Sequence, residues 1–243
     1  MYSNKLKKLI HCFGNERNII NIDEVCNMIK VSDIDLIPIN THKVYEFKDW
    51  KDIHIGYGDA CWAKLEKEID VSKKEPVWNI NLPTTAKQAI ERINYIVDSW
   101  GSKAIKLEVL TPDYKVSVNN EVIKVIERFK DSNLEIWPLL TPNYEDAKRC
   151  IKLGCKLLRI MGTPIASGKG LTEESIKVVK KLKEDYPEIK IMLDGGIGNV
   201  DDFIKAIDIG CDCVLVNSCL FVDKTKKPHE KLAEFVKASN LYE

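Results

Sequence analysis

The stretch AIKLEVL, residues 104–110, has the composition of a buried β-strand, because it is an apolar, β-branched run between a glycine and a Thr-Pro pair. Side chains alternate between the two faces of a strand, so Lys106 and Glu108 share one face and the apolar residues share the other. Burying an ammonium and a carboxylate costs free energy. The pair therefore needs either a structural or a chemical reason.

Outward from this stretch, short apolar runs recur along the whole chain and alternate with amphipathic stretches of helical spacing. The other runs are KLIHCF (8–13), DLIPIN (35–40), VWNINL (77–82), EIWPLL (135–140), KLLRIM (156–161), KIMLDG (190–195) and CVLVNS (213–218). The predicted helices cover 22–30, 85–100, 119–130, 143–153, 174–186, 200–210 and 229–239. Eight strands, most followed by a helix, predict a (β/α)8 TIM barrel, as one domain over residues 1–243.

An open doubly wound sheet is the competing architecture, but it usually has fewer strands and a glycine-rich first turn. The turn after the first run, FGNERN, carries one glycine, which favours the barrel. Residues 41–76 are longer than one connection, and HIGYGDACWAKLEKEID within them predicts a short strand or turn followed by a helix.

Composition excludes several classes of function. Lys plus Arg and Asp plus Glu number 37 each, so the charge gives no case for a nucleic-acid or anionic-membrane partner. The chain has no apolar run near 18 residues and no signal-peptide core at its N-terminus, so we expect no membrane span and a cytoplasmic location. The eight cysteines form no C-x-x-C pair and the four histidines are scattered, which favours cysteines in the core and predicts no metal site.

Three strand ends run into unusual loops: MGTPIASGKGL (161–171), DGGIGN (194–199) and NSCLF (217–221). They hold half of the chain's 12 glycines, in loops that barrel closure brings together. Glycines let the backbone approach a ligand, and consecutive N–H groups then cradle an anion. Tight strand-to-helix turns would explain each glycine singly, but their clustering favours phosphate binding.

Lys106 has two interpretations inside such a barrel. It is either a core ion pair with Glu108 or an amine nucleophile, since burial disfavours the charged form of an amine. Glu108 opposes the second role by favouring the ammonium, unless it takes the proton. Asp194, at the end of the seventh strand, supplies a second carboxyl for proton transfer. This combination predicts imine chemistry on a phosphorylated, sugar-like ketone or aldehyde.

In their order and spacing, IKLEVL, MGTPIASGKGL, LDGGIG and CVLVNS resemble the bacterial thiazole synthase family, over most of residues 77–220 and more weakly over 8–45. The resemblance implies an enzyme without a cofactor that binds 1-deoxy-D-xylulose 5-phosphate and attacks its ketone with Lys106. Glu108 and Asp194 match the acid/base carboxylates. The phosphate contacts fall on Gly162, Gly195, Gly196, Asn217 and Ser218.

In the family, sulfur arrives from a small carrier protein with a C-terminal thiocarboxylate, and dehydroglycine completes the thiazole ring. The resemblance also implies a homo-oligomer.

The chain departs from the family pattern at the loops that would meet these later substrates. It has NLPTT (81–85) in place of an Asn-Thr-Ala-Gly-Cys stretch, LTPDYKVSVNN (110–120) after the lysine strand, and LTEES (171–175) after GKG. The second of these offers Asp113 as an acid and Tyr114 as a wall. Two alternatives therefore stay open: a divergent Schiff-base enzyme acting on a related sugar phosphate in another sulfur- or nitrogen-incorporating pathway, or a catalytically silent barrel that binds a phosphorylated metabolite.

Overall fold

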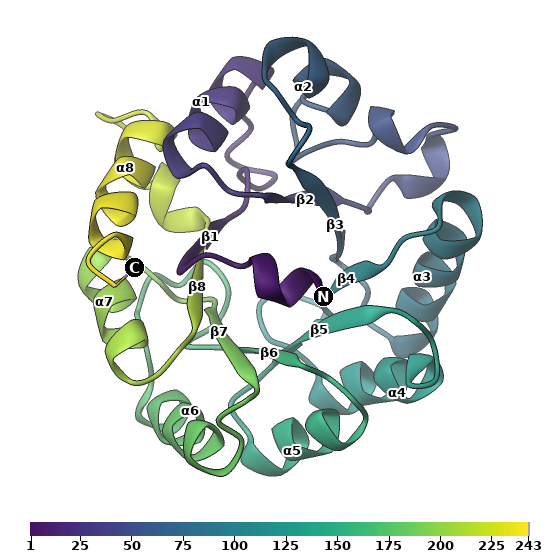
Figure 1. The fold of residues 1–243 in the computed structure, drawn as a ribbon, viewed down its shortest axis with the longest axis vertical. Coiled ribbons are helices and arrows are strands. Elements are labelled where there is room, and N and C mark those ends of the chain that lie inside the picture. The colour runs from purple at the N-terminus through teal and green to yellow at the C-terminus, as the bar shows by residue number, and fades with distance from the viewer. Residues whose placement is uncertain (243) are drawn as a thin grey trace.

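The computed structural model describes residues 1–242, in which eight parallel strands form a barrel surrounded by a ring of helices (Figure 1). The strands are β1 (Leu9–His11), β2 (Leu36–Asn40), β3 (Glu75–Ile80), β4 (Ala104–Leu107), β5 (Glu135–Leu140), β6 (Leu157–Ile160), β7 (Lys190–Asp194) and β8 (Cys213–Val216). The helices are α1 (Ile22–Ser32), α2 (Trp62–Glu68), α3 (Ala86–Trp100), α4 (Asn119–Phe129), α5 (Tyr144–Lys152), α6 (Glu173–Asp185), α7 (Val200–Asp208) and α8 (Pro228–Ser239). The (β/α)8 prediction is confirmed.

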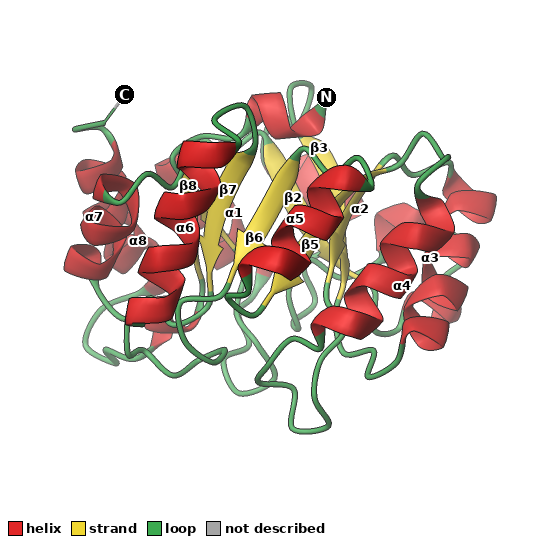
Figure 2. Cartoon of the chain, turned by 90° about the horizontal axis from the view of Figure 1, so that it is seen from below, coloured by secondary structure: helices red, strands yellow, loops and turns green. Residues whose placement is uncertain are grey.

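Neighbouring strands pair in the order β1-β8-β7-β6-β5-β4-β3-β2, so the sheet follows the chain around the barrel. The register places Asn40 beside Asn79, and Asn79 beside Lys106, so these three polar residues lie at one level of the barrel. All carboxyl ends of the strands meet at one end of the barrel, where the long loops gather (Figure 2).

Local chemistry explains where several helices begin. Five of them start after an Asn or Thr whose side chain accepts a hydrogen bond from the backbone N–H three residues on: Asn21, Thr85, Asn143, Thr172 and Asn199. Such a cap contributes about 0.5–2 kcal/mol to stability. Each cap also ends the loop that precedes the helix, and it thereby limits the length of the loops at the carboxyl ends of the strands.

The long segment between β2 and β3 contains two short 3-10 helices, η2 (Val44–Glu46) and η3 (Trp50–Asp52), before α2. His54 and Cys61 pair as an isolated antiparallel bridge around a tight turn. The predicted turn and helix in this segment are confirmed. The turn carries Gly56 and Tyr57 to the mouth of the barrel, where both line a cavity.

Apolar side chains fill the barrel interior towards the amino ends of the strands: Ile10, Leu36, Val77, Ala104, Trp137, Leu157, Met192, Cys213 and Leu215. The N-terminal 3-10 helix η1 (Tyr2–Lys5) covers this end, opposite the long loops (Figure 2). The backbone N–H groups of Tyr2 and Ser3 each donate to the Glu135 carboxylate at 2.7 Å, and Lys190 Nζ donates to the Ser3 carbonyl at 3.0 Å. The barrel interior is thus filled at this end, and the N-terminal helix covers it.

No helix within residues 1–242 combines the length and the apolarity that crossing a membrane requires.

Candidate active site

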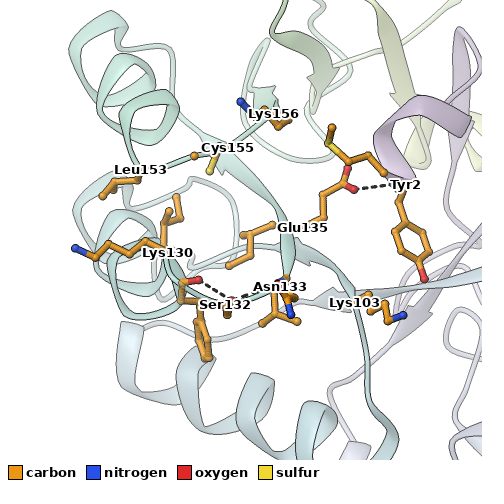
Figure 3. A pocket seen from close by; sticks show the side chains of 15 residues that line it. Tyr2, Lys103, Lys130, Ser132, Asn133, Glu135, Leu153, Cys155 and Lys156 are labelled. Atoms are coloured by element: carbon orange, nitrogen blue, oxygen red, sulfur yellow. Dashed lines mark hydrogen bonds between the residues drawn. The ribbon is translucent and has the colours of Figure 1, made fainter.

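A cavity of about 420 Å³ opens at the carboxyl ends of the strands. Its lining includes seven of the eight predicted site residues: Lys106, Glu108, Asp194, Gly195, Gly196, Asn217 and Ser218. A second cavity, of about 400 Å³, lies at the amino ends of the strands and is lined by Lys103, Lys130, Glu135, Lys156 and their neighbours (Figure 3). It contains none of the predicted residues, so we place the chemistry at the first cavity.

The ion pair expected inside the barrel is present. Lys106 Nζ donates to Glu108 Oε1 at 2.6 Å and to Asn79 Oδ1 at 3.2 Å, and it lies 3.9 Å from Asp194 Oδ2. The Lys106 and Glu108 residues are 4% and 7% exposed, yet both line the cavity. The amine is therefore shielded from bulk water but open to a ligand.

Arg159, on β6, contacts both carboxylates and does not line the cavity. The sequence analysis missed this residue. Its Nη2 lies 2.6 Å from Glu108 Oε1 and 2.5 Å from Asp194 Oδ2, and its Nε donates to Asp194 Oδ2 at 2.7 Å. The residue is fully buried. The signal was available, because an arginine in the apolar run KLLRIM raises the same question as the lysine in AIKLEVL.

Two members of this cluster, Glu108 and Arg159, have pKa values displaced by their charged neighbours. Burial alone would raise the pKa of Glu108, but the charges of Lys106 and Arg159 and their hydrogen bonds lower it to about 2. Burial alone would lower the pKa of Arg159, but Asp194 and Glu108 raise it. Two cations thus face two carboxylates in a buried, charge-balanced cluster.

Uncharged polar groups form the wall on the side of β2 and β3. Asn79 Nδ2 donates to Asn40 Oδ1 at 3.3 Å, and Asn81 Nδ2 donates to the Tyr57 hydroxyl at 3.0 Å. Burial, followed by the charges of Glu16 and Glu108, raises the pKa of Tyr57 to about 12, so the phenol keeps its proton at neutral pH. Within residues 1–242, the buried Oδ1 of Asn81 has no hydrogen-bond partner. The sequence analysis placed Asn81 in a loop that meets later substrates, but it did not assign Asn40, Asn79 or Tyr57 to the site.

The glycine loops after β6 and β7 pack backbone against backbone. Gly170 N–H donates to the Gly196 carbonyl at 2.7 Å, and a Cβ on Gly196 would lie 2.0 Å from Thr163 Oγ1. A Cβ on Gly162 would lie 2.9 Å from the carbonyls of both Gly170 and Gly195. Gly162 is the predicted site residue that does not line the cavity; it lies in the loop contact behind the wall. Close packing of the loop backbones, and not phosphate binding alone, therefore explains part of the glycine cluster.

Asn217 and Ser218 follow β8 and line the cavity on the side of β1. The Asn217 side chain makes a reciprocal pair with Gly14, accepting from its N–H and donating to its carbonyl at 3.0 Å each. A ligand contact from this side chain would require the pair to open. Cys12, at the end of β1, is half-buried and lines the same region, and burial raises the pKa of its thiol.

The loop at 110–120, where the chain departs from the family pattern, lines the mouth through Asp113, Tyr114 and Lys115. The backbone N–H of Ile165 donates to the Lys115 carbonyl at 3.0 Å, which ties this loop to the one after β6. Tyr114 lines the cavity and is 46% exposed, so its role as a wall stays a prediction. Asp113 accepts from Thr111 Oγ1 at 2.6 Å and is exposed, so its role as an acid stays a prediction.

No group of His, Cys, Asp and Glu within residues 1–242 has the arrangement of a metal site. The side chains that face the cavity can hold a carbonyl compound near an amine, accept and return protons, and bind hydroxyl groups.

Comparison with known proteins points to one family. Residues 60–239 match the family model described as thiazole biosynthesis protein ThiG. The thiazole synthase of Clostridium acetobutylicum is 30% identical over 168 residues, covering 63% of this chain and 65% of that protein. The thiazole synthase of Bradyrhizobium diazoefficiens is 29% identical, covering 67% of this chain and 61% of that protein. The chain thus matches less than two thirds of the length of these relatives.

Among solved structures, the Amycolatopsis orientalis BexX/CysO complex matches with a TM-score of 0.81 at 18% identity, covering 97% of this chain and 89% of that chain. The structure named native KDPGal matches with a TM-score of 0.55 at 18% identity, over 96% of this chain and 94% of that chain. At these identities the likeness concerns the fold. The family match, however, covers well over half of the sequence, and so the chain belongs to the ThiG thiazole biosynthesis family, as a divergent member.

Proposed function

We propose that this protein is a thiazole synthase-like transferase that forms an imine between Lys106 and the ketone of 1-deoxy-D-xylulose 5-phosphate. The observation that carries the proposal is the 2.6 Å contact between Lys106 Nζ and Glu108 Oε1 at a ligand-accessible cavity, with Asp194 Oδ2 3.9 Å away. An amine with a carboxylate in direct contact has a partner for every proton that imine formation moves.

The proton transfers balance within the site. The Lys106 ammonium passes a proton to Glu108, and the resulting amine attacks the ketone carbon. One proton then moves from the attacking nitrogen to the carbonyl oxygen, which becomes a hydroxyl. Glu108 then returns the proton to that hydroxyl, which leaves as water, so ammonium and ketone become iminium and water with the charge unchanged. Asp194 next removes a proton from the carbon beside the iminium, which prepares that carbon for the later steps.

Binding of the sugar phosphate uses the two remaining walls. We assign the phosphate to the backbone around Gly195, Gly196, Asn217 and Ser218, with Gly162 supporting that loop from behind. Hydroxyl groups of the sugar meet Tyr57 and Asn81 on the opposite side. There a phenol O–H donor lies next to an unoccupied amide acceptor, which together complement an alcohol.

For the later steps we propose sulfur transfer from a carrier protein with a C-terminal thiocarboxylate, followed by ring completion with dehydroglycine to give the thiazole phosphate of thiamine. The BexX/CysO complex supports a protein partner, because that barrel of similar fold was solved together with a second protein. We also propose a single-domain, cytoplasmic homo-oligomer, as expected of the family. The altered mouth loops at 81–85 and 110–120 favour a second candidate, in which a related sugar phosphate enters another sulfur- or nitrogen-incorporating pathway.

Borohydride trapping tests the imine directly. The protein is mixed with 1-deoxy-D-xylulose 5-phosphate, reduced, and weighed by intact mass spectrometry. We expect a stable adduct in the wild type that is lost in Lys106→Ala. The matched control is Lys115→Ala, which removes another cavity-lining lysine and should keep the adduct. An adduct that survives Lys106→Ala, or no adduct with any pentulose phosphate, contradicts the proposal.

Two further measurements separate the remaining candidates. A silent metabolite-binding barrel leaves carbon-bound protons of the sugar in place, whereas imine formation exchanges them for deuterium in heavy water, as NMR detects. Complementation of a thiazole-requiring strain separates the two enzymes. Growth with the wild type but not with Lys106→Ala supports the thiazole reaction, and trapping without growth supports the divergent one.

A further inference from the structure

All three nitrogens of the Arg159 guanidinium have hydrogen-bond partners, although the residue does not line the cavity. Besides Glu108 and Asp194, it reaches the main chain, with Nη1 3.2 Å from the Leu107 carbonyl and 3.4 Å from the Trp137 carbonyl. Its Nη2 touches one oxygen of each carboxylate. Since both oxygens contact the same nitrogen, the two carboxylates are close neighbours, and two carboxylates in one buried space ordinarily retain a proton between them.

We propose that Arg159 is a positioning residue that keeps Glu108 and Asp194 ionised together, so that each reaction cycle begins with two bases and not with one acid and one base. The inference rests on the proposed function, because it states which side chains carry a proton before the Lys106 imine forms. Its geometric basis is the shared contact: one permanent cation, 0% exposed, lies between both carboxylates on the side away from the cavity.

Charge conservation gives this arrangement a chemical meaning. Lys106 is a cation before the reaction as an ammonium and after it as an iminium, so Arg159 keeps the cluster neutral in both states. The proton needed to expel water then comes from the lysine by way of Glu108, over their 2.6 Å contact. Without Arg159 the cluster carries one excess negative charge, and a carboxyl would take up a proton from solvent to offset it.

Other groups that face the carboxylates do not supply this charge. Lys106 is the reacting group. Cys12 and Tyr57 have raised pKa values and are neutral at physiological pH. The charged groups at the rim of the cavity are exposed: Glu16, Arg17, Asp113 and Lys115. The remaining neighbours on β2 and β3 are the uncharged amides already described. Arg159 therefore holds the second carboxylate ionised.

Carbon-13 NMR of the wild type, with labelled Glu and Asp side-chain carboxyls, tests the resting state from pH 5 to 8. The Glu108 and Asp194 signals are identified by their loss in Glu108→Gln and Asp194→Asn. We expect neither signal to titrate in this range. A titration of either one between pH 5 and 8 overturns the proposal, and this measurement needs no Arg159 variant.

Two substitutions separate charge from structure. In Arg159→Met we expect one carboxyl group to titrate about 1–3 pH units higher than in the wild type. The pH below which adduct formation with 1-deoxy-D-xylulose 5-phosphate declines should rise by the same amount. Arg159→Lys keeps the charge and should keep the wild-type pH profile even if it is less stable. Equal profiles for the Met and Lys variants overturn the proposal. If Arg159→Met fails to fold, the wild-type titration decides. Failure of borohydride trapping in the wild type refutes the imine. The NMR titration then still tests the proposed effect of Arg159 on the two carboxylates.

Discussion

The Lys106–Glu108 pair allows a quantitative test of how the buried charges depend on one another. At 2.6 Å and an effective dielectric constant of 20, two unit charges attract by about 6 kcal/mol. Desolvation offsets much of this, but removing one partner leaves the other charge buried and uncompensated, which typically costs about 3–5 kcal/mol. We therefore expect Lys106→Met and Glu108→Gln each to destabilise the fold by about that amount.

The double variant is the informative one, because it restores charge balance. Arg159 and Asp194 still face each other, and the Met and Gln side chains nearly conserve volume. We expect the double variant to lose less stability than the sum of the single losses, by about 1–3 kcal/mol. Urea denaturation followed by tryptophan fluorescence and circular dichroism gives the free energy of unfolding for all four proteins.

An exposed pair of equal length provides the control. Arg149 Nη2 lies 2.6 Å from Glu127 Oε1, with side chains 55% and 41% exposed. The same cycle with Arg149→Met and Glu127→Gln should show a coupling too small to separate from zero, because solvent screens exposed pairs. Strictly additive losses at Lys106 and Glu108, or a coupling no larger than that of the control, would refute the reasoning.

Three further predictions address the loops, the pH dependence and the capped end. Gly196→Ala should lower the thermal midpoint and reduce adduct formation, because its Cβ would lie 2.0 Å from Thr163 Oγ1. Gly154 is the control, because it also has a positive φ but nothing lies within 4 Å of a Cβ there. Gly154→Ala should lower the stability only by the backbone strain of about 1–2 kcal/mol. Burial lowers the pKa of His11 to about 4, so the unfolded chain takes up this proton first as pH falls. Stability is then fully present above pH 6.5 and falls by about 3 kcal/mol towards pH 4. Urea midpoints measured across that range should show the fall, and His11→Asn should flatten it. Glu135→Gln should weaken the acceptor for the amides of the N-terminal 3-10 helix and speed their hydrogen exchange, while exchange at β7 stays unchanged.

The strands and most helices were predictable because each of them has a local signal. A buried parallel strand is a short apolar run, and Asn or Thr caps mark where the helices begin. The alternation of side chains in AIKLEVL also placed Lys106 and Glu108 inside the barrel correctly. The same rule applied to KLLRIM would have found Arg159, since that residue faces inward at the register of β6.

What the sequence could not provide was the contact between segments far apart in the chain. The turn carrying Tyr57 reaches Asn81 only because the long β2–β3 connection folds over the mouth, and no local pattern predicts that meeting. Gly162 looked like its neighbours in sequence, but the opposing carbonyls of Gly170 and Gly195 place it behind the wall. Backbone packing between two loops has no signature in either loop alone.

The filled barrel interior restricts the order in which reactants can reach Lys106. Apolar side chains fill the barrel interior towards the amino ends of the strands, and the N-terminal 3-10 helix covers that end (Figure 2), so reactants approach the amine from the mouth. In the proposed reaction, a sugar joined to Lys106 lies between the amine and every later reagent. A reagent that enters first occupies the path that the sugar needs. For the proposed reaction, steady-state kinetics should therefore be ordered, with the sugar phosphate binding first and excess carrier tail acting as a competitive inhibitor against it.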